Sequence, residues 1–148
     1  MRKAFAERQY KIVTIAGIGP GGSSGILYEL RVEALPAGFF AWLRAAYPPP
    51  GAFANGKPAV PDEGALADYN DRFNLIVLAK ALEADGCLET PWPAKDAGRP
   101  AWHAFGGAIR EEFQVACYSE GDVQQLALAA LDLVRARDIT GAEAARGN

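Results

Sequence analysis

The chain has 148 residues and a mass of 15.7 kDa, the size of one compact domain. Its 15 Lys and Arg residues against 18 Asp and Glu residues give a net charge of −3, which lacks the basic excess that non-specific nucleic-acid binding requires. One histidine, two cysteines and one methionine supply little material for metal or nucleophilic chemistry. Half of the residues are hydrophobic and 29 are alanine, so we expect a mainly helical protein that binds rather than reacts.

No targeting or membrane segment is recognisable in the sequence. The apolar run 12–16 is too short for the hydrophobic region of a signal peptide, and no stretch approaches the ~18 apolar residues of a membrane span. Cys87 and Cys117 do not form a disulfide framework and are expected to be reduced, small core residues. We therefore expect a cytoplasmic protein with no membrane partner.

Two strands are expected near the N-terminus, at 11–16 and 26–34, on either side of the glycine-rich stretch 17–25. The second strand alternates with period 2, since its apolar side chains share one face and its charged side chains the other. The apolar face comprises Ile26, Tyr28, Leu30, Val32 and Ala34, and the charged face Glu29, Arg31 and Glu33. A hairpin over 10–34 is predicted, with the following helices covering its apolar face.

Four short helices are predicted after the hairpin, at about 36–47, 62–84, 101–117 and 120–137. The first begins with Pro36 in its first turn, and the second with Asp62 as its N-cap. The second helix is apolar over much of its circumference and is expected to be central. The fourth begins with a capping box made by Ser119 and Asp122, and its apolar face is expected to include Leu131.

These elements predict an α+β, mainly helical class: an N-terminal β-hairpin packed on about four helices. Residues 1–137 are expected to form a single domain. Residues 138–148 carry little bulky apolar surface and are predicted to be a flexible C-terminal tail.

Three motifs could carry chemistry, and none has the required context. Residues 17–22 match the G-x-G-x-x-G dinucleotide fingerprint, but a strand follows them where a helix is needed. His103 has no partner on its own helix, because Glu111 lies about 80° around it. The acidic stretch 68–72 lacks the turn glycine of a calcium loop and is interpreted as a polar helix face. No catalytic residue, metal or cofactor is therefore predicted.

Aromatic side chains outside the core pattern are the candidate binding residues. Some of these rings occupy adjacent helical positions that cannot all face one core, and others lie in proline-rich connections. The candidates are Phe40, Trp42, Phe53, Trp92 and Trp102. Exposed aromatics are typical of a partner surface. The alternative is that the connections fold back and bury these rings.

The order of short motifs in this chain resembles the tail assembly chaperones of long-tailed, siphovirus-type bacteriophages. The motifs span roughly residues 26–137 and are collinear with that family. They are Leu35-Pro36-x-x-Phe39-x-x-x-Leu43 with Tyr47-Pro48-Pro49, Tyr69-Asn70-x-x-Phe73-x-x-Ile76-Val77-x-Ala79, Tyr118-Ser119-x-Gly121-x-Val123-x-x-Leu126, and Ala129-Ala130-x-x-Leu133-Val134.

The resemblance implies a small, non-enzymatic protein made in the cytoplasm of the infected host cell. Such a protein binds the tape measure protein and recruits subunits of the major tail tube protein during tail morphogenesis, and self-association is a further expected contact. The glycine-rich stretch 17–25 is longer, and the segment 89–102 richer in proline and tryptophan, than the family pattern. These departures leave a second reading, a structural tail or adaptor subunit of the virion.

Overall fold

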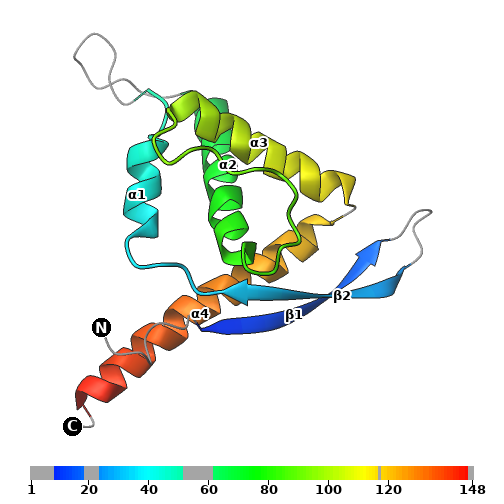
Figure 1. The fold of residues 1–148 in the computed structure, drawn as a ribbon, viewed down its shortest axis with the longest axis vertical. Helices are drawn as coiled ribbons and strands as arrows, with labels where there is room; N and C mark the ends of the chain where they lie inside the picture. The colour runs from blue at the N-terminus through cyan, green and yellow to red at the C-terminus, as the bar shows by residue number, and fades with distance from the viewer. Residues whose placement is uncertain (1–8, 19–23, 52–61, 117, 147–148) are drawn as a thin grey trace.

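The computed structural model describes residues 9–18, 24–51, 62–116 and 118–146. An antiparallel hairpin precedes four helices, which confirms the α+β, mainly helical class (Figure 1). The elements in chain order are β1 (Tyr10–Ile18), β2 (Ser24–Glu33), α1 (Phe39–Ala46), α2 (Glu63–Leu82), α3 (Arg99–Val115) and α4 (Glu120–Arg146). Helix α2 runs through the middle of the molecule, with α1 beside it and α3 across it.

The hairpin has the two faces that its alternation predicts. Strands β1 and β2 pair in register from Tyr10 opposite Glu33 to Gly17 opposite Ile26. Leu30 and Val32 are buried and Glu29 is exposed. Helix α4 packs against both strands and α2 packs against β2, so these two helices cover the apolar face.

Side chains from the helices also tie down the two outer edges of the hairpin. The backbone N–H of Arg31 on β2 donates to Oδ1 of Asp85 at 2.7 Å, just beyond the end of α2. On β1 the carbonyl of Thr14 accepts a hydrogen bond from Nε2 of Gln125 on α4 at 3.3 Å. Polar groups at strand edges need such partners, and here they fix the hairpin to α2 and α4.

Helix α1 is shorter than the predicted 36–47 because it begins at Phe39. Gly38 precedes it with φ 80°, a left-handed conformation that glycine adopts freely and that interrupts helical geometry. Pro36 therefore lies outside the helix, and its carbonyl accepts a bond from the N–H of Phe39 at 3.2 Å. The inward face of the helix is confirmed, since Phe39 and Leu43 are buried.

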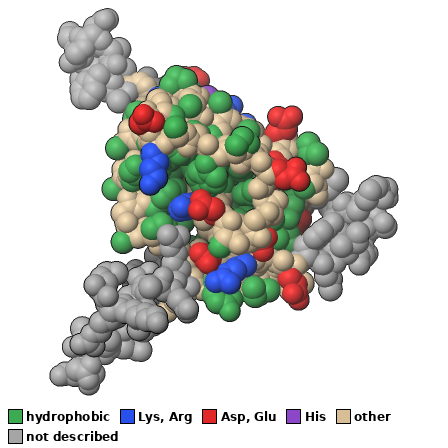
Figure 2. Space-filling view, viewed as in Figure 1, with side chains coloured by type: hydrophobic (Ala, Val, Ile, Leu, Met, Phe, Trp, Pro, Cys, Tyr) green, Lys and Arg blue, Asp and Glu red, His purple; other side chains and the backbone are tan. Residues whose placement is uncertain are grey.

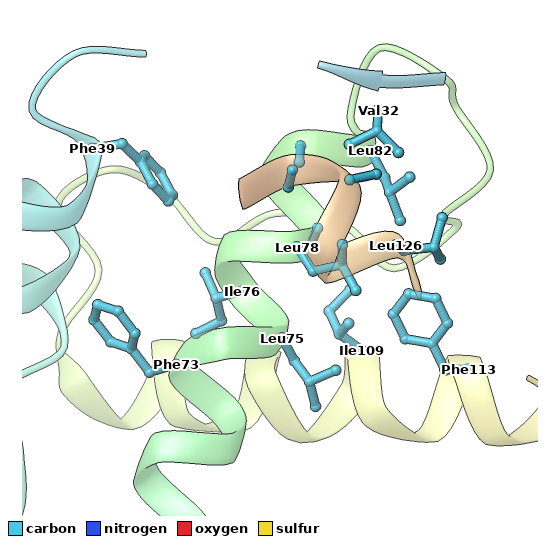
Figure 3. Packing of buried hydrophobic residues seen from close by; sticks show 14 of the residues in the cluster. Val32, Phe39, Phe73, Leu75, Ile76, Leu78, Leu82, Ile109, Phe113 and Leu126 are labelled. Atoms are coloured by element: carbon cyan, nitrogen blue, oxygen red, sulfur yellow. The ribbon is translucent and has the colours of Figure 1, made fainter. Parts of the chain in front are cut away.

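Helix α2 is central, as its broad apolar surface predicts. Asp62 is confirmed as its N-cap, because Oδ2 accepts the N–H of Ala65 at 3.1 Å. Eight of its side chains are buried, namely Tyr69, Phe73, Leu75, Ile76, Leu78, Ala79, Ala81 and Leu82. Figure 3 shows Phe73, Leu75, Ile76, Leu78 and Leu82 among them, in one core with side chains from α1, α3, α4 and β2.

Helix α3 begins two residues before its predicted start at 101 and ends two residues before 117. Pro100 lies in its first turn, where the missing N–H of proline costs nothing. The helix crosses α2 at close range at Gly106, since a Cβ built there would lie 2.7 Å from Cβ of Arg72. Cys117, just beyond this helix, lies outside the described residues.

The capping box at the start of α4 is confirmed. The N–H of Ser119 donates to Oδ2 of Asp122 at 2.8 Å, and the N–H of Asp122 donates to Oγ of Ser119 at 3.1 Å. The predicted apolar face is partly wrong. Leu131 is 43% exposed, whereas Leu133 is buried. Alanines on both sides of the helix make two stripes equally apolar in sequence, and packing on the hairpin selects one of them.

The prediction that the helix ends at 137 is also wrong, because α4 continues to Arg146 through most of the predicted tail at 138–148. Alanine, glutamate and arginine are strong helix formers and extend an established helix without further core packing. A lack of bulky apolar residues argues against burial of this segment but not against helix.

Candidate functional site

Three elements enclose an open groove of about 530 Å³, which we call the tryptophan groove. All three tryptophans of the chain line it. Trp42 comes from α1, Trp92 from the connection between α2 and α3, and Trp102 from α3. Phe39, Lys80, Glu83, Pro93, Lys95 and the segment 36–38 complete the lining. Figure 2 shows apolar side chains gathered in a hollow on this face, with acidic and basic side chains at its border.

Trp102 forms the floor of the groove and the other two indoles pack against it. The ring centroids of Trp42 and Trp102 lie 5.3 Å apart with planes at 88°, an edge-to-face contact. Trp92 lies 6.3 Å from Trp102 and 4.6 Å from Phe105. Helix α3 presents Trp102 and Phe105 one turn apart, so this aromatic stack follows from helical spacing.

One polar atom of Trp102 has no partner among the described residues. Trp102 is 1% exposed, and its indole N–H donates to no acceptor among the described residues. Buried donors are almost always paired in folded proteins, because an unpaired one costs about 1–3 kcal/mol. Trp102, which lines the tryptophan groove, therefore carries one buried hydrogen-bond donor that the described chain leaves unused.

Two lysines give the rim its charge. Nζ of Lys80 lies 3.2 Å from the carboxylate of Glu83 and 5.7 Å from the centroid of the Trp92 ring, so this ammonium is engaged. Lys95 is exposed and pairs with no carboxylate of the described residues. The rim thus presents one unpaired positive charge beside an apolar floor.

The structure separates the five predicted binding residues. Trp42, Trp92 and Trp102 come together in the tryptophan groove, although Trp102 is a buried floor residue and not an exposed contact. Phe40 is 43% exposed but lies off the groove, where its ring stacks on Phe73. Phe53 lies outside the described residues.

Sequence reasoning missed the charged rim of the groove. Lys80 and Glu83 are three residues apart at the end of α2, the ordinary spacing of a solvated helix pair. Lys95 lies in an irregular connection without periodicity. No sequence signal would have placed either lysine beside tryptophans from other elements.

A polar cluster around Asp68 joins α2 to α3. Its Oδ2 accepts from Nε of Arg72 at 2.8 Å, and its Oδ1 accepts from Arg110 at 2.9 Å. The hydrogen bonds from Arg110 and Arg72 lower the pKa of Asp68 below its ordinary value. The stretch 68–72 is confirmed as a helix face, and its charges hold the neighbouring helix.

His103 belongs to this cluster and is not the isolated side chain that its own helix suggests. Its Nδ1 lies 2.8 Å from the hydroxyl of Tyr47, and its Nε2 lies 3.9 Å from Asp68. Burial first, and then the positive charges of Arg72 and Arg99, lower the pKa of His103. The imidazole is therefore neutral at pH 7, and its hydrogen bond to Tyr47 links α3 to the end of α1.

The D68N variant tests the contribution of this cluster. We expect unfolding to require about 1 kcal/mol less free energy at pH 7, since two charge-assisted hydrogen bonds weaken at a partly exposed site. A carboxyl with a lowered pKa stabilises the fold above its unfolded pKa of about 3.9, and that contribution disappears as the pH falls through the folded pKa. Urea unfolding from pH 7 to 3 should show the difference between the two proteins shrinking below about pH 4; a difference that stays constant down to pH 3 contradicts this.

Binding a metal, acting as a nucleophile and binding a nucleotide each require particular groups among the described residues. Among the described residues, no group of three His, Cys, Asp or Glu side chains could hold a metal ion. Burial, and then the nearby charge of Asp85, raises the pKa of Cys87 to about 12, so its thiol is protonated at pH 7. The glycine motif at 17–22 ends β1 and precedes another strand, with residues 19–23 outside the described part. The largest structural feature left for a candidate site in the described residues is the apolar tryptophan groove.

Within the described residues, no helix is both long and apolar enough to cross a membrane. No family model matches the chain, and no curated protein or solved structure matches it either.

Proposed function

We propose that this chain is a non-enzymatic chaperone of phage tail assembly that holds an apolar segment of the tape measure protein in the tryptophan groove. The single observation behind this proposal is the groove itself, which has an aromatic floor and an open mouth beside exposed Trp42. Clustered tryptophans in a partly desolvated pocket are typical of the residues that dominate protein association. The motif order from Leu35 to Val134 supports the choice of client.

In this proposal the protein works in the host cytoplasm by reversible binding. It shields the apolar client before assembly and brings subunits of the major tail tube protein to it. Preferential binding to an exposed segment lowers the concentration of the aggregation-prone free form by mass action. No covalent step is needed, so hydrophobic and hydrogen-bonding contacts suffice.

The test compares two neighbouring aromatics of α1 with similar exposure, 37% for Trp42 and 43% for Phe40. The chain is co-expressed with the tape measure protein of the same genome, and the affinity of the purified pair is measured by titration calorimetry. W42A should weaken binding at least about tenfold, as expected for a hot spot, because Trp42 lines the groove. F40A should change it less than about twofold, because Phe40 lies outside the lining.

Three results would contradict the proposal. Equal losses in W42A and F40A would move the binding surface away from the groove. The absence of binding to any tape measure segment would exclude the chaperone function. Stoichiometric amounts of the chain in purified phage particles would favour the second reading, a structural tail or adaptor subunit.

A further inference from the structure

We propose that the tryptophan groove takes an extended, proline-containing segment whose backbone carbonyl accepts the indole N–H of Trp102 and whose carboxylate pairs with Lys95. This inference rests on the proposed function, because it names the chemistry of the client segment that binds in the same groove. It adds a conformation, one hydrogen bond and one charge, each of which can be measured separately.

The unused donor of Trp102 carries the first step. The indole is 1% exposed in the floor of the groove, and its N–H has no acceptor among the described residues. A partner that supplies an acceptor removes the cost of this unpaired donor, which a purely apolar partner cannot do. The indole N–H of Trp102 therefore favours a ligand with a carbonyl oxygen that can accept its hydrogen bond.

The need for a free carbonyl favours an extended segment over a helix. A helix satisfies its own carbonyls except in its last turn, whereas every carbonyl of a polyproline II segment is free. Proline also brings no N–H that would need a partner in an apolar groove. One turn of a helix about 10–12 Å wide already occupies about 400–600 Å³, so a groove of about 530 Å³ seats little more than one turn.

The aromatic walls fit the same ligand. Grooves lined by aromatic rings are a recurring site for polyproline II segments, which lose little conformational entropy on binding. Trp42 and Trp92 both pack against Trp102, with ring centroids 5.3 and 6.3 Å from it. Proline rings can pack on these two walls while the carbonyl between them reaches the floor.

Charge complementarity predicts an acidic residue in the ligand, in addition to the carbonyl and the proline rings. Lys80 is already engaged by Glu83 at 3.2 Å, so a ligand carboxylate gains little there. Lys95 has no carboxylate partner among the described residues and lines the same groove. An acidic residue next to the proline-containing stretch would pair with Lys95.

Access to the donor requires one wall side chain to move, because Nε1 of Trp102 is fully buried. Trp42 is suited to this movement, since it is 37% exposed and touches Trp102 edge-on. Rotamer changes of this kind are common at interfaces. Trp42 thus acts as a movable wall and Trp102 as a fixed floor.

The experiment observes the three indole N–H groups of the intact, ¹⁵N-labelled chain directly. W42F and W92F identify two of the signals, and the third belongs to Trp102, so no variant of the buried residue is needed. The probe is the peptide acetyl-APPLPPEA-amide. Binding should move the Trp102 proton signal downfield and slow its exchange with solvent, because its N–H gains an acceptor.

Matched peptides and one protein variant test the other two elements. Replacing the prolines with alanine, in a peptide of equal length or a longer helical one, should weaken binding about tenfold or more. Replacing the glutamate with glutamine should weaken it about 2–5-fold, the range of an exposed ion pair. In K95A this second replacement should have no further effect, because Lys95 is the partner of that carboxylate.

Several outcomes overturn the inference. The hydrogen bond is wrong if the peptide binds without shifting the Trp102 proton signal. The extended conformation is wrong if an alanine helix binds equally well. If the indole signals shift with protein concentration alone, the occupant of the groove is a second copy of this chain. The tape measure protein separates the two proposals. If it binds and shifts the signals of Trp42 and Trp92 but not that of Trp102, the proline assignment fails and the chaperone proposal stands. If it does not bind at all, the chaperone proposal fails.

Discussion

Replacing Trp102 with alanine is expected to lower the free energy of unfolding by about 2–4 kcal/mol. Truncating a buried Trp typically costs about 3–5 kcal/mol, and removal of its unpaired N–H returns about 1 kcal/mol of that. Trp102 is 1% exposed and touches Trp42, Trp92 and Phe105, so its removal opens a cavity under the groove. Urea unfolding followed by circular dichroism measures the loss without relying on tryptophan fluorescence.

W42A is the matched control, because it removes the same side chain from the other half of one edge-to-face pair. More than a third of Trp42 is already in water, so the expected loss is about 1–2 kcal/mol. W102A should therefore lose more stability than W42A, whereas both variants remove part of the groove lining and should weaken binding of the client. Equal losses of stability would show that Trp102 is not the floor of the groove.

The elements of this fold were predictable from the sequence because their signals are local. The alternation of charged and apolar residues from Glu29 to Ala34 depends only on strand geometry. The caps made by Asp62 and by Ser119 with Asp122 need partners three residues away, which any sequence shows directly. The N-terminal ends of α2 and α4 were accordingly predicted within one residue of their observed starts.

Predictions failed where tertiary packing decides between local alternatives. The buried stripe of α4 includes Leu133 and excludes Leu131 because the hairpin packs on one side of an alanine-rich helix. Helix α1 begins at Phe39 and not at the predicted Pro36, because Gly38 adopts a left-handed conformation. The neighbouring residues contain no sequence signal for that conformation. The extension of α4 to Arg146 shows that a segment with few bulky apolar residues can still be helical.

The sequence predicted that aromatic residues would form the candidate site, but it did not predict which of them lie together in the folded protein. Trp42 comes from α1, Trp92 from the connection between α2 and α3, and Trp102 from α3, so only the folded chain brings them together. The same limit applies to His103, whose nearest polar partners, Tyr47 and Asp68, lie far away in sequence. Aromatic surplus can suggest binding, but burial has to be seen in three dimensions, as Trp102 demonstrates.

Replacing Gly106 with alanine should destabilise the protein by about 1–3 kcal/mol, although alanine is the better helix former by about 1 kcal/mol. The added Cβ would lie 2.7 Å from Cβ, 3.1 Å from the carbonyl oxygen and 3.2 Å from Cα of Arg72. Two of these atoms belong to the backbone of α2, so the helices themselves must separate. Urea unfolding at pH 7 measures the loss.

G107A is the neighbouring control. Its Cβ would meet Nη1 of Arg72 at 2.5 Å, which is the end of a flexible side chain. The guanidinium can move away at the cost of its hydrogen bond to the carbonyl of His103, about 1 kcal/mol, which the gain in helix propensity offsets. We expect a net change within about 1 kcal/mol of zero, and a G106A protein as stable as G107A would show that α2 and α3 do not cross at Gly106.

G106A should also weaken binding in the tryptophan groove, although Gly106 does not line it. Gly106 lies one helical turn after Trp102, while Lys80 lies in the last turn of α2 and Glu83 is its C-cap, so separating α2 from α3 moves the floor relative to the rim. Coupling through a backbone shift is worth about 0.5–1 kcal/mol here, a roughly 2–5-fold loss of affinity for the client. Because G107A leaves the helix spacing unchanged, its affinity should equal that of the wild type. A G106A protein that is destabilised but binds normally would show that the shape of the groove does not depend on this helix crossing.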